Sequence, residues 1–156
     1  MKAKILKTNR YELKFYLNYY DYHLLRTKLL AICQPDPYMT DPNGYMVRSL
    51  YFDDPSKSSL ETKLDGVLMR EKYRIRIYEP NAAKAKFEIK KKLNNQISKE
   101  SYSLNKNEVL AIEKGEDYSC LLKQNLPGLN KIYSLFRSYY YRPTSLIQYT
   151  REAYLH

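Results

Sequence analysis

The sequence predicts an α+β domain built on an antiparallel β-sheet, and two patterns support this fold class. Charged and apolar residues alternate in several segments, as in strands whose successive side chains point to opposite faces of a sheet. Between these segments, apolar residues recur at the three- and four-residue spacing of amphipathic helices. The 156 residues suffice for one domain with its own core. No repeat or low-complexity linker divides the chain, so we expect a single domain over residues 1–156.

Turn and capping residues divide the first half of the chain into elements. Asn18 is a typical N-cap, and three prolines with an Asn-Gly pair interrupt regular structure between residues 34 and 44. The predicted elements are a strand over 9–17, a helix over 19–33, a loop over 34–44, a strand over 45–53 and a short helix from Pro55 to about Gly66.

The second half is divided in the same way. Pro80 ends a strand, Asn94-Asn95 predicts the turn of a hairpin, and Gly115 stops a helix. The predicted elements are strands over 67–79, 84–93 and 97–104, helices over 105–114, 117–123 and 129–141, and a last strand over 146–155.

In four alternating segments, charged residues, most of them cationic, lie at every second position. These segments are Arg10–Lys14, Lys72–Arg76, Lys86–Lys90 and Tyr149–Arg151. In one sheet, such rows would form a single basic surface. Closing the sheet into a barrel would turn that surface inward and make a cationic tunnel for a long polyanion. We therefore expect an antiparallel β-barrel with flanking helices, of which this chain forms only part. The alternative is an open sheet whose charges face water.

The composition points to a polyanionic partner. Lys and Arg number 27 against 17 Asp and Glu, which gives a formal charge of +10 and a pI near 9.4. Such an excess attracts nucleic acid, phosphates or an acidic membrane surface. The 18 tyrosines suit amphipathic sheet faces and can also stack on bases.

Several common functional motifs are missing from the sequence. His23 and His156 have no evident partner for nucleophilic catalysis, and the four glycines form neither a Walker loop nor a dinucleotide fingerprint. Cys33 and Cys120 lack metal-ligand spacing, which is typical of reduced cytosolic thiols. No apolar run is long enough to span a bilayer and no signal peptide is evident, so we expect a cytoplasmic protein without a transmembrane segment.

The cationic rows supply the candidate phosphate-binding residues. Arg74 and Arg76 share one face of a predicted strand, and Lys72 and Arg70 continue the row. Arginine binds phosphate oxygens in a bidentate manner, and lysine adds a point charge. Further lysines on the rows are Lys14, Lys90 and Lys99.

Two carboxylates, Glu12 and Glu88, lie within the same rows. One interpretation is that each forms a cross-strand salt bridge with a neighbouring cation. The other is that they hold a divalent metal, Mg or Mn, because hard oxygen ligands suit these ions.

An ordered set of motifs resembles a known family. The motifs are Arg10-x-Glu12-x-Lys14, Ser49-Leu50-Tyr51-Phe52-Asp53, Arg70-x-Lys72-x-Arg74-Ile75-Arg76-x-Tyr78, Phe87-Glu88-x-Lys90, Lys99 and Tyr149-x-Arg151-x-Ala153-Tyr154. This set is similar to the polyphosphate polymerase domain of the vacuolar transporter chaperone (VTC) type, a branch of the CYTH-like triphosphate tunnel metalloenzymes. The resemblance runs from about residue 9 to the last residue.

The resemblance implies a tunnel that transfers the γ-phosphate of ATP to a growing polyphosphate chain with the help of a divalent metal, Mn or Mg. It implies that Lys14, Arg74, Arg76 and Lys90 hold the triphosphate in the catalytic site. Lys99 and Arg151 would guide the polyphosphate, with Lys72 and Arg70 beside them. Ser49–Asp53 would be largely structural.

The family pattern continues after the strand that matches 149–154, with strands that carry another arginine, the principal metal-binding glutamate and a late lysine. We therefore expect a domain that lacks the last strands, with a barrel completed by a partner chain or by a homodimer. One alternative function is non-catalytic binding of polyphosphate or nucleic acid. Nucleic acid is less favoured, because Tyr73 is predicted on the face opposite Arg74 and Arg76 and so cannot stack beside them.

Overall fold

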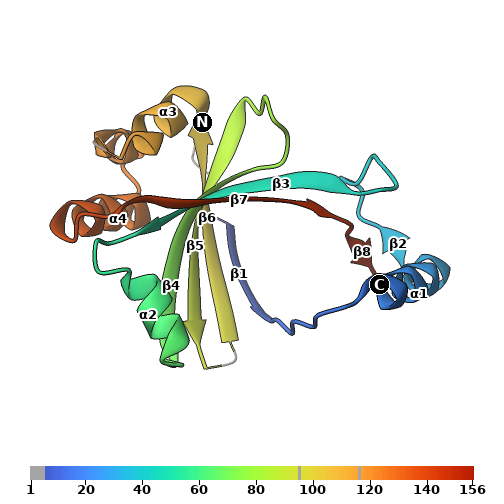
Figure 1. Cartoon of the computed structure of the whole chain (residues 1–156). Helices are drawn as coiled ribbons and strands as arrows, with labels where there is room; N and C mark the ends of the chain where they lie inside the picture. Colours follow the sequence, from blue (N-terminus) through green and yellow to red (C-terminus); the bar gives the residue numbers. More distant parts are fainter. Residues whose placement is uncertain (1–5, 95, 116) are drawn as a thin grey trace.

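The computed structural model describes residues 6–94, 96–115 and 117–156, with side chains from Tyr11 onward. Strands and helices both contribute, which confirms the α+β class (Figure 1). The elements are β1 (Leu6–Tyr11), α1 (Tyr19–Ile32), β2 (Gln34–Pro35), β3 (Tyr45–Asp53), α2 (Ser58–Leu64), β4 (Met69–Ile77), β5 (Lys84–Leu93), β6 (Gln96–Asn105), α3 (Lys106–Glu113), the 3-10 helix η1 (Ser119–Gln124), α4 (Pro127–Ser138), β7 (Arg142–Arg151) and β8 (Tyr154–Leu155).

A six-stranded antiparallel sheet forms the centre of the molecule, with the strand order β1-β6-β5-β4-β3-β7. In Figure 1, β3 and β7 run across the direction of β4, β5 and β6, so the sheet is strongly twisted. In the described part of the chain, β1 pairs only with β6 and β7 only with β3. The predicted antiparallel sheet is therefore confirmed, but these residues form an open sheet rather than a closed barrel.

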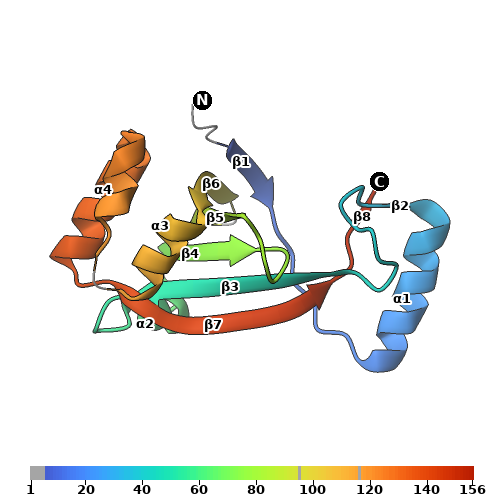
Figure 2. The same cartoon turned by 90° about the horizontal axis from the view of Figure 1, so that it is seen from above.

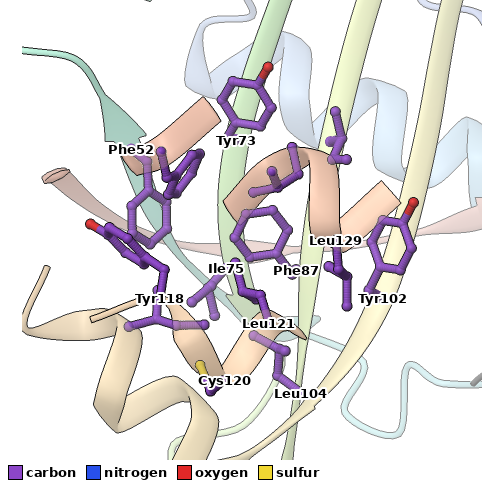
Figure 3. Close-up of a cluster of buried hydrophobic side chains, with 14 of the residues drawn as sticks. Phe52, Tyr73, Ile75, Phe87, Tyr102, Leu104, Tyr118, Cys120, Leu121 and Leu129 are labelled. Atoms are coloured by element: carbon purple, nitrogen blue, oxygen red, sulfur yellow. The ribbon is translucent and has the colours of Figure 1, made fainter. Parts of the chain in front are cut away.

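One face of the sheet carries the hydrophobic core. Apolar residues at alternate positions of β3 to β6 pack against α3, η1 and α4, which lie together on one side of the sheet (Figures 1 and 2). Figure 3 shows strand residues such as Phe52, Tyr73 and Phe87 in one cluster with Leu121 and Leu129 from the helical layer. Burial of these large side chains stabilises the domain and commits this face of the sheet to packing. The opposite face carries the alternate residues of the same strands, many of them charged.

Local signals explain where several elements begin and turn. The Asn18 side chain accepts a hydrogen bond from the Asp21 amide at 2.8 Å, as predicted for the N-cap of α1. A capping box between Asn105 and Glu108 starts α3. The β5–β6 hairpin turns at Asn94, whose φ of 53° lies in the left-handed region that asparagine tolerates.

The first predicted strand is wrong over its second half. β1 ends at Tyr11, and residues 12–18 are irregular, although their sequence alternates as far as residue 17. The reason is the length of the neighbouring strand: Tyr11 pairs with Gln96, the first residue of β6, so later residues have no backbone partner there. Glu12 and Lys14 are therefore placed by an irregular segment.

A second, smaller unit lies at the far end of β3 and β7. Two-residue strands β2 and β8 pair with each other beside α1 (Figures 1 and 2). Glu152 ties this unit together, because it accepts hydrogen bonds from Tyr22, Arg26 and Tyr154. Among the described helices, none has the length and apolar character needed to cross a membrane.

Candidate phosphate-binding site

The face of the sheet opposite the core gathers the predicted cations, and we call it the charged face. Strand register sets this arrangement: Arg74 of β4 lies opposite Glu88 of β5, and Lys90 of β5 lies between Lys72 and Lys99 on its two neighbouring strands. Directly paired residues of an antiparallel sheet share a face. Three neighbouring strands, β4, β5 and β6, thus place their charges together.

Glu88 is the centre of this arrangement, and its side chain is fully buried. One carboxylate oxygen, Oε2, accepts a hydrogen bond from Arg74 Nε at 2.8 Å and lies 2.7 Å from Arg74 Nη2. The same oxygen is 3.7 Å from Arg76 Nη1, and Oε1 is 3.4 Å from Lys99 Nζ. The interpretation of Glu88 as a cross-strand salt bridge is therefore supported by its contacts.

The cations decide the ionisation of Glu88. Burial opposes the charged carboxylate, but Arg74, Arg76 and Lys99 outweigh burial and lower the pKa of Glu88 below its usual value. Burial likewise disfavours the charge on Arg74, yet Glu88 and Tyr51 raise the Arg74 pKa above its usual value. If one charge were removed from such a cluster, the charges of the remaining residues would be uncompensated.

This pKa direction predicts a pH dependence of stability. A carboxyl whose pKa is lower in the folded state contributes stability that is present above its unfolded pKa, about 4.3 for glutamate. That contribution is lost as the pH falls through the lower, folded pKa. In acid unfolding followed by circular dichroism, we expect stability to fall more steeply below about pH 4.3 in the wild type than in Glu88→Gln, which cannot titrate. If the stability of both proteins fell equally with pH, titration of Glu88 would not be the cause of the acid sensitivity.

Strand β3 supplies two further polar contacts to the arginines. Arg74 Nη1 donates to the Tyr51 hydroxyl at 2.9 Å, and Arg76 Nε donates to Ser49 Oγ at 3.1 Å. The Arg74 Cζ atom also lies 5.7 Å from the centroid of the Tyr51 ring. Sequence reasoning gave the segment 49–53 a largely structural role and missed these contacts. Alternation along β3 could have indicated them, because it places Ser49 and Tyr51 on one face.

Glu12 and Lys14 approach the charged face from the irregular segment after β1. Glu12 Oε2 lies 2.5 Å from Lys90 Nζ, and Glu12 Oε1 lies 3.9 Å from Lys14 Nζ. The Lys14 side chain is 80% exposed, in contrast to the half-buried Lys90. Of the four residues predicted to hold the triphosphate, Arg74, Arg76 and Lys90 share the sheet surface, and Lys14 lies at its margin.

Lys72 and Arg70 extend the row toward α2. Arg70 donates to the backbone carbonyl of Lys63 at 3.2 Å. Lys72 is half-buried, and among the described residues its ammonium forms no salt bridge with a carboxylate. Burial lowers the Lys72 pKa, and the positive charge of Lys63 adds to that effect. A half-buried lysine without a salt bridge in this setting is a candidate anion ligand.

Arg151 lies elsewhere on the same sheet. It pairs with Tyr45 at the far end of β3, four residues before Ser49, which corresponds to roughly 13 Å along the strand. There it lines a hollow of about 550 Å³ beside α1 with Tyr22, Arg26, Tyr149 and Tyr154. The structure therefore does not bring Arg151 into contact with the Glu88 cluster.

The predicted metal ligands do not form a metal site in this arrangement. Both Glu88 oxygens face cations, and Glu12 lies between two lysines. Within the described ranges, no group of three or more His, Cys, Asp or Glu side chains could hold a metal ion. Glu12 and Glu88 therefore do not fit the divalent ion that the resemblance implies, and we assign no step to it.

Comparisons with known proteins agree with this fold. A crystal structure of a candidate adenylate cyclase from Bacillus halodurans superposes with a TM-score of 0.51 and 15% sequence identity, covering 97% of this chain and 67% of that chain. At this identity the likeness establishes the fold alone. No curated protein matches the sequence. The family model of the VTC domain matches residues 9–156, nearly the whole chain. The resemblance drawn from the motifs is thus confirmed, and the chain belongs to the VTC domain family.

Proposed function

We propose that the charged face binds the triphosphate of ATP and chains of inorganic polyphosphate. The observation that carries this proposal is the gathering of Arg74, Arg76 and Lys99 around one buried carboxylate, with the half-buried Lys72 on the same face. Phosphate oxygens accept charge-assisted hydrogen bonds from guanidinium and ammonium groups, and such bonds are stronger than those between neutral groups. A chain of phosphates repeats the same chemistry along its length, so a row of cations suits it.

We assign different roles to the members of the row. Glu88, Ser49 and Tyr51 fix the guanidinium groups of Arg74 and Arg76, which limits the side-chain entropy lost when phosphate binds. Lys90 and Lys99 extend the contacts toward β6. Lys14, Lys72, Arg70 and Arg151 would attract or guide the more distant phosphates of a long chain.

The reaction we propose is γ-phosphoryl transfer to the end of a polyphosphate chain, as in polyphosphate polymerases of the VTC type. A terminal phosphate oxygen of the chain attacks the γ-phosphorus of ATP, the bond to the β–γ bridging oxygen breaks, and ADP leaves. Such transfer depends mainly on in-line positioning and on neutralising charge on the phosphoryl oxygens. Arg74, Arg76 and Lys90 are the residues that would perform these tasks here.

Non-catalytic binding of polyphosphate is the second candidate function. The engagement of Glu12 and Glu88 by cations favours it, because neither carboxylate is arranged to receive a divalent ion. Binding without turnover needs only the cationic row. Synthesis of polyphosphate from ATP would decide between the two functions.

The open sheet suggests how a partner could take part. β1 and β7 are its two edges, and edge strands present unpaired backbone groups that can accept a further strand. We propose that a partner chain or a second copy of this chain pairs with one of these edges and encloses the charged face. Size-exclusion chromatography with light scattering would show whether a dimer forms.

Among ligands that carry no base, affinity should rise with the number of phosphates. Each added phosphate gains a further set of charge-assisted contacts, so we expect long polyphosphate to bind more tightly than tripolyphosphate, and tripolyphosphate more tightly than pyrophosphate. Isothermal titration calorimetry at one fixed salt concentration would measure this order, because screening changes all such affinities.

A single-stranded oligonucleotide with the same number of phosphates is the matched competitor. The proposed function expects it to bind more weakly than polyphosphate, because consecutive phosphates are farther apart along its backbone. Tighter binding of the oligonucleotide would instead identify the charged face as a nucleic-acid interface.

A further inference from the structure

Two tyrosines and a lysine lie just beyond Arg76 on the charged face, and we call Tyr45, Tyr78 and Lys86 the aromatic platform. Tyr45 begins β3, Tyr78 follows the last residue of β4, and Lys86 belongs to β5. The ring centroids of Tyr45 and Tyr78 are 6.0 Å apart, with their planes inclined at 56°. The ammonium of Lys86 lies 5.3 Å from the centroid of the Tyr78 ring.

Strand register places this platform next to the arginine cluster. Lys86 is the direct cross-strand partner of Arg76, so the two share the charged face, and the Lys86 contact brings the Tyr78 ring to that side. Tyr78 follows Arg76 by two residues, which corresponds to about 7 Å along the chain. When Arg76 holds one group of a ligand, a neighbouring group of the same ligand can therefore reach the aromatic platform.

The hydrophobic core does not account for these rings. Neither Tyr45 nor Tyr78 belongs to the buried core cluster, which lies on the other face, and both remain partly accessible to solvent. Tyr73, by contrast, is buried in that cluster, as its position in the sequence predicts. Aromatic rings that face solvent beside phosphate-binding cations are the arrangement that proteins use to stack nucleobases.

We propose that the aromatic platform is a nucleobase subsite that binds the purine ring of ATP while Arg76 and Arg74 hold its triphosphate. This inference rests on the proposed function, since it needs the phosphates on the charged face. The base would lie against Tyr78 and Tyr45, and Lys86 would contact the first phosphate or the ribose. The subsite distinguishes the donor nucleotide from the polyphosphate acceptor, because only the donor carries a base.

A pair of variants separates base contacts from phosphate contacts. Tyr78→Leu keeps apolar bulk but removes the ring, and stacking on an aromatic ring contributes enough that ATP should bind about tenfold more weakly. Tripolyphosphate, which has no base, should change by less than about twofold. Tyr78→Phe keeps the ring and should bind both ligands like the wild type. Tyr139→Leu is the control, since Tyr139 is exposed at the end of α4 on the opposite side of the sheet.

The outcomes distinguish the subsite from the proposed function. Equal weakening of ATP and tripolyphosphate by Tyr78→Leu would overturn the subsite, because the ring would then support the phosphate contacts or the fold. Unchanged ATP binding would overturn it as well. If the wild type binds no tripolyphosphate at all, the proposed function fails, and the inference fails with it.

Measurements on the wild-type chain alone test the same point without a variant. A purine offers more stacking area than a pyrimidine, so ATP should bind more tightly than UTP, although their phosphates are identical. Equal affinities for ATP, UTP and tripolyphosphate would exclude a contribution from the base and overturn the subsite.

Discussion

Replacement of Glu88 by glutamine is expected to lower the free energy of unfolding by about 3–5 kcal/mol, because removing one partner of a buried ion pair leaves uncompensated buried charge. Glu88 is fully buried, and its carboxylate faces Arg74, Arg76 and Lys99. Glutamine has nearly the same shape, so the loss measures charge rather than packing. Urea unfolding at neutral pH, followed by circular dichroism, would give the free energy directly.

The same variant should respond more strongly to polyphosphate. A bound anion supplies the negative charge that Glu88→Gln lacks, so the rise in melting temperature on adding polyphosphate should exceed that of the wild type. Glu12→Gln is the matched control, because it removes the same charge from a partly exposed pair with Lys90 and should cost about 1 kcal/mol or less. A Glu88→Gln protein as stable as the wild type would show that the cluster is not a source of stability.

Much of the fold follows from local pattern. The strands predicted over 45–53 and 84–93 match β3 and β5 residue for residue, because β-branched, aromatic or alternating residues are bounded there by turn signals. The strand predicted over 9–17 shows the limit of this reasoning. Its alternation is real, but a strand also needs a backbone partner, and β6 begins only opposite Tyr11. Pairing between distant segments cannot be read from the segment itself.

For the candidate site, too, local pattern predicts which residues of one strand share a face, but not how the strands pair. Alternation correctly predicts that Arg74 and Arg76 share a face of β4, because the two-residue period requires it. That Lys90 lies on the same face depends on the register of β4 with β5. Alternation does not predict that Glu88 is buried, since this depends on cations that the β4–β5 and β5–β6 registers bring to it. The position of Arg151 likewise depends on the register of β3 with β7, which no local pattern fixes.

Truncation of Phe136 to alanine should lower the free energy of unfolding by about 3–5 kcal/mol, as much as Glu88→Gln. The reason is that the cavity left in a packed core adds to the lost burial. Phe136 of α4 is fully buried. Its ring lies 4.9 to 5.9 Å from those of Phe52, Tyr73, Phe87, Tyr118 and Tyr141. The ring thus joins residues of β3, β4, β5 and the helical layer, and an alanine side chain is too short to do so. Thermal and urea unfolding would measure the loss.

The effect of Phe136→Ala on ligand binding should be small, because Phe136 packs on the face of the sheet opposite the charged face. The core and the charged face lie on opposite sides of β4 and β5, so the variant should keep its affinity for tripolyphosphate within about threefold at temperatures where it remains folded. Tyr139→Ala removes an exposed ring from the end of the same helix and should change stability by no more than about 0.5 kcal/mol. A Phe136→Ala protein that unfolds like the wild type would contradict the packing role of this ring. Loss of tripolyphosphate binding by a folded variant would show that the two faces are coupled, because β4 and β5 carry core residues and phosphate-binding cations on alternate positions of the same backbone.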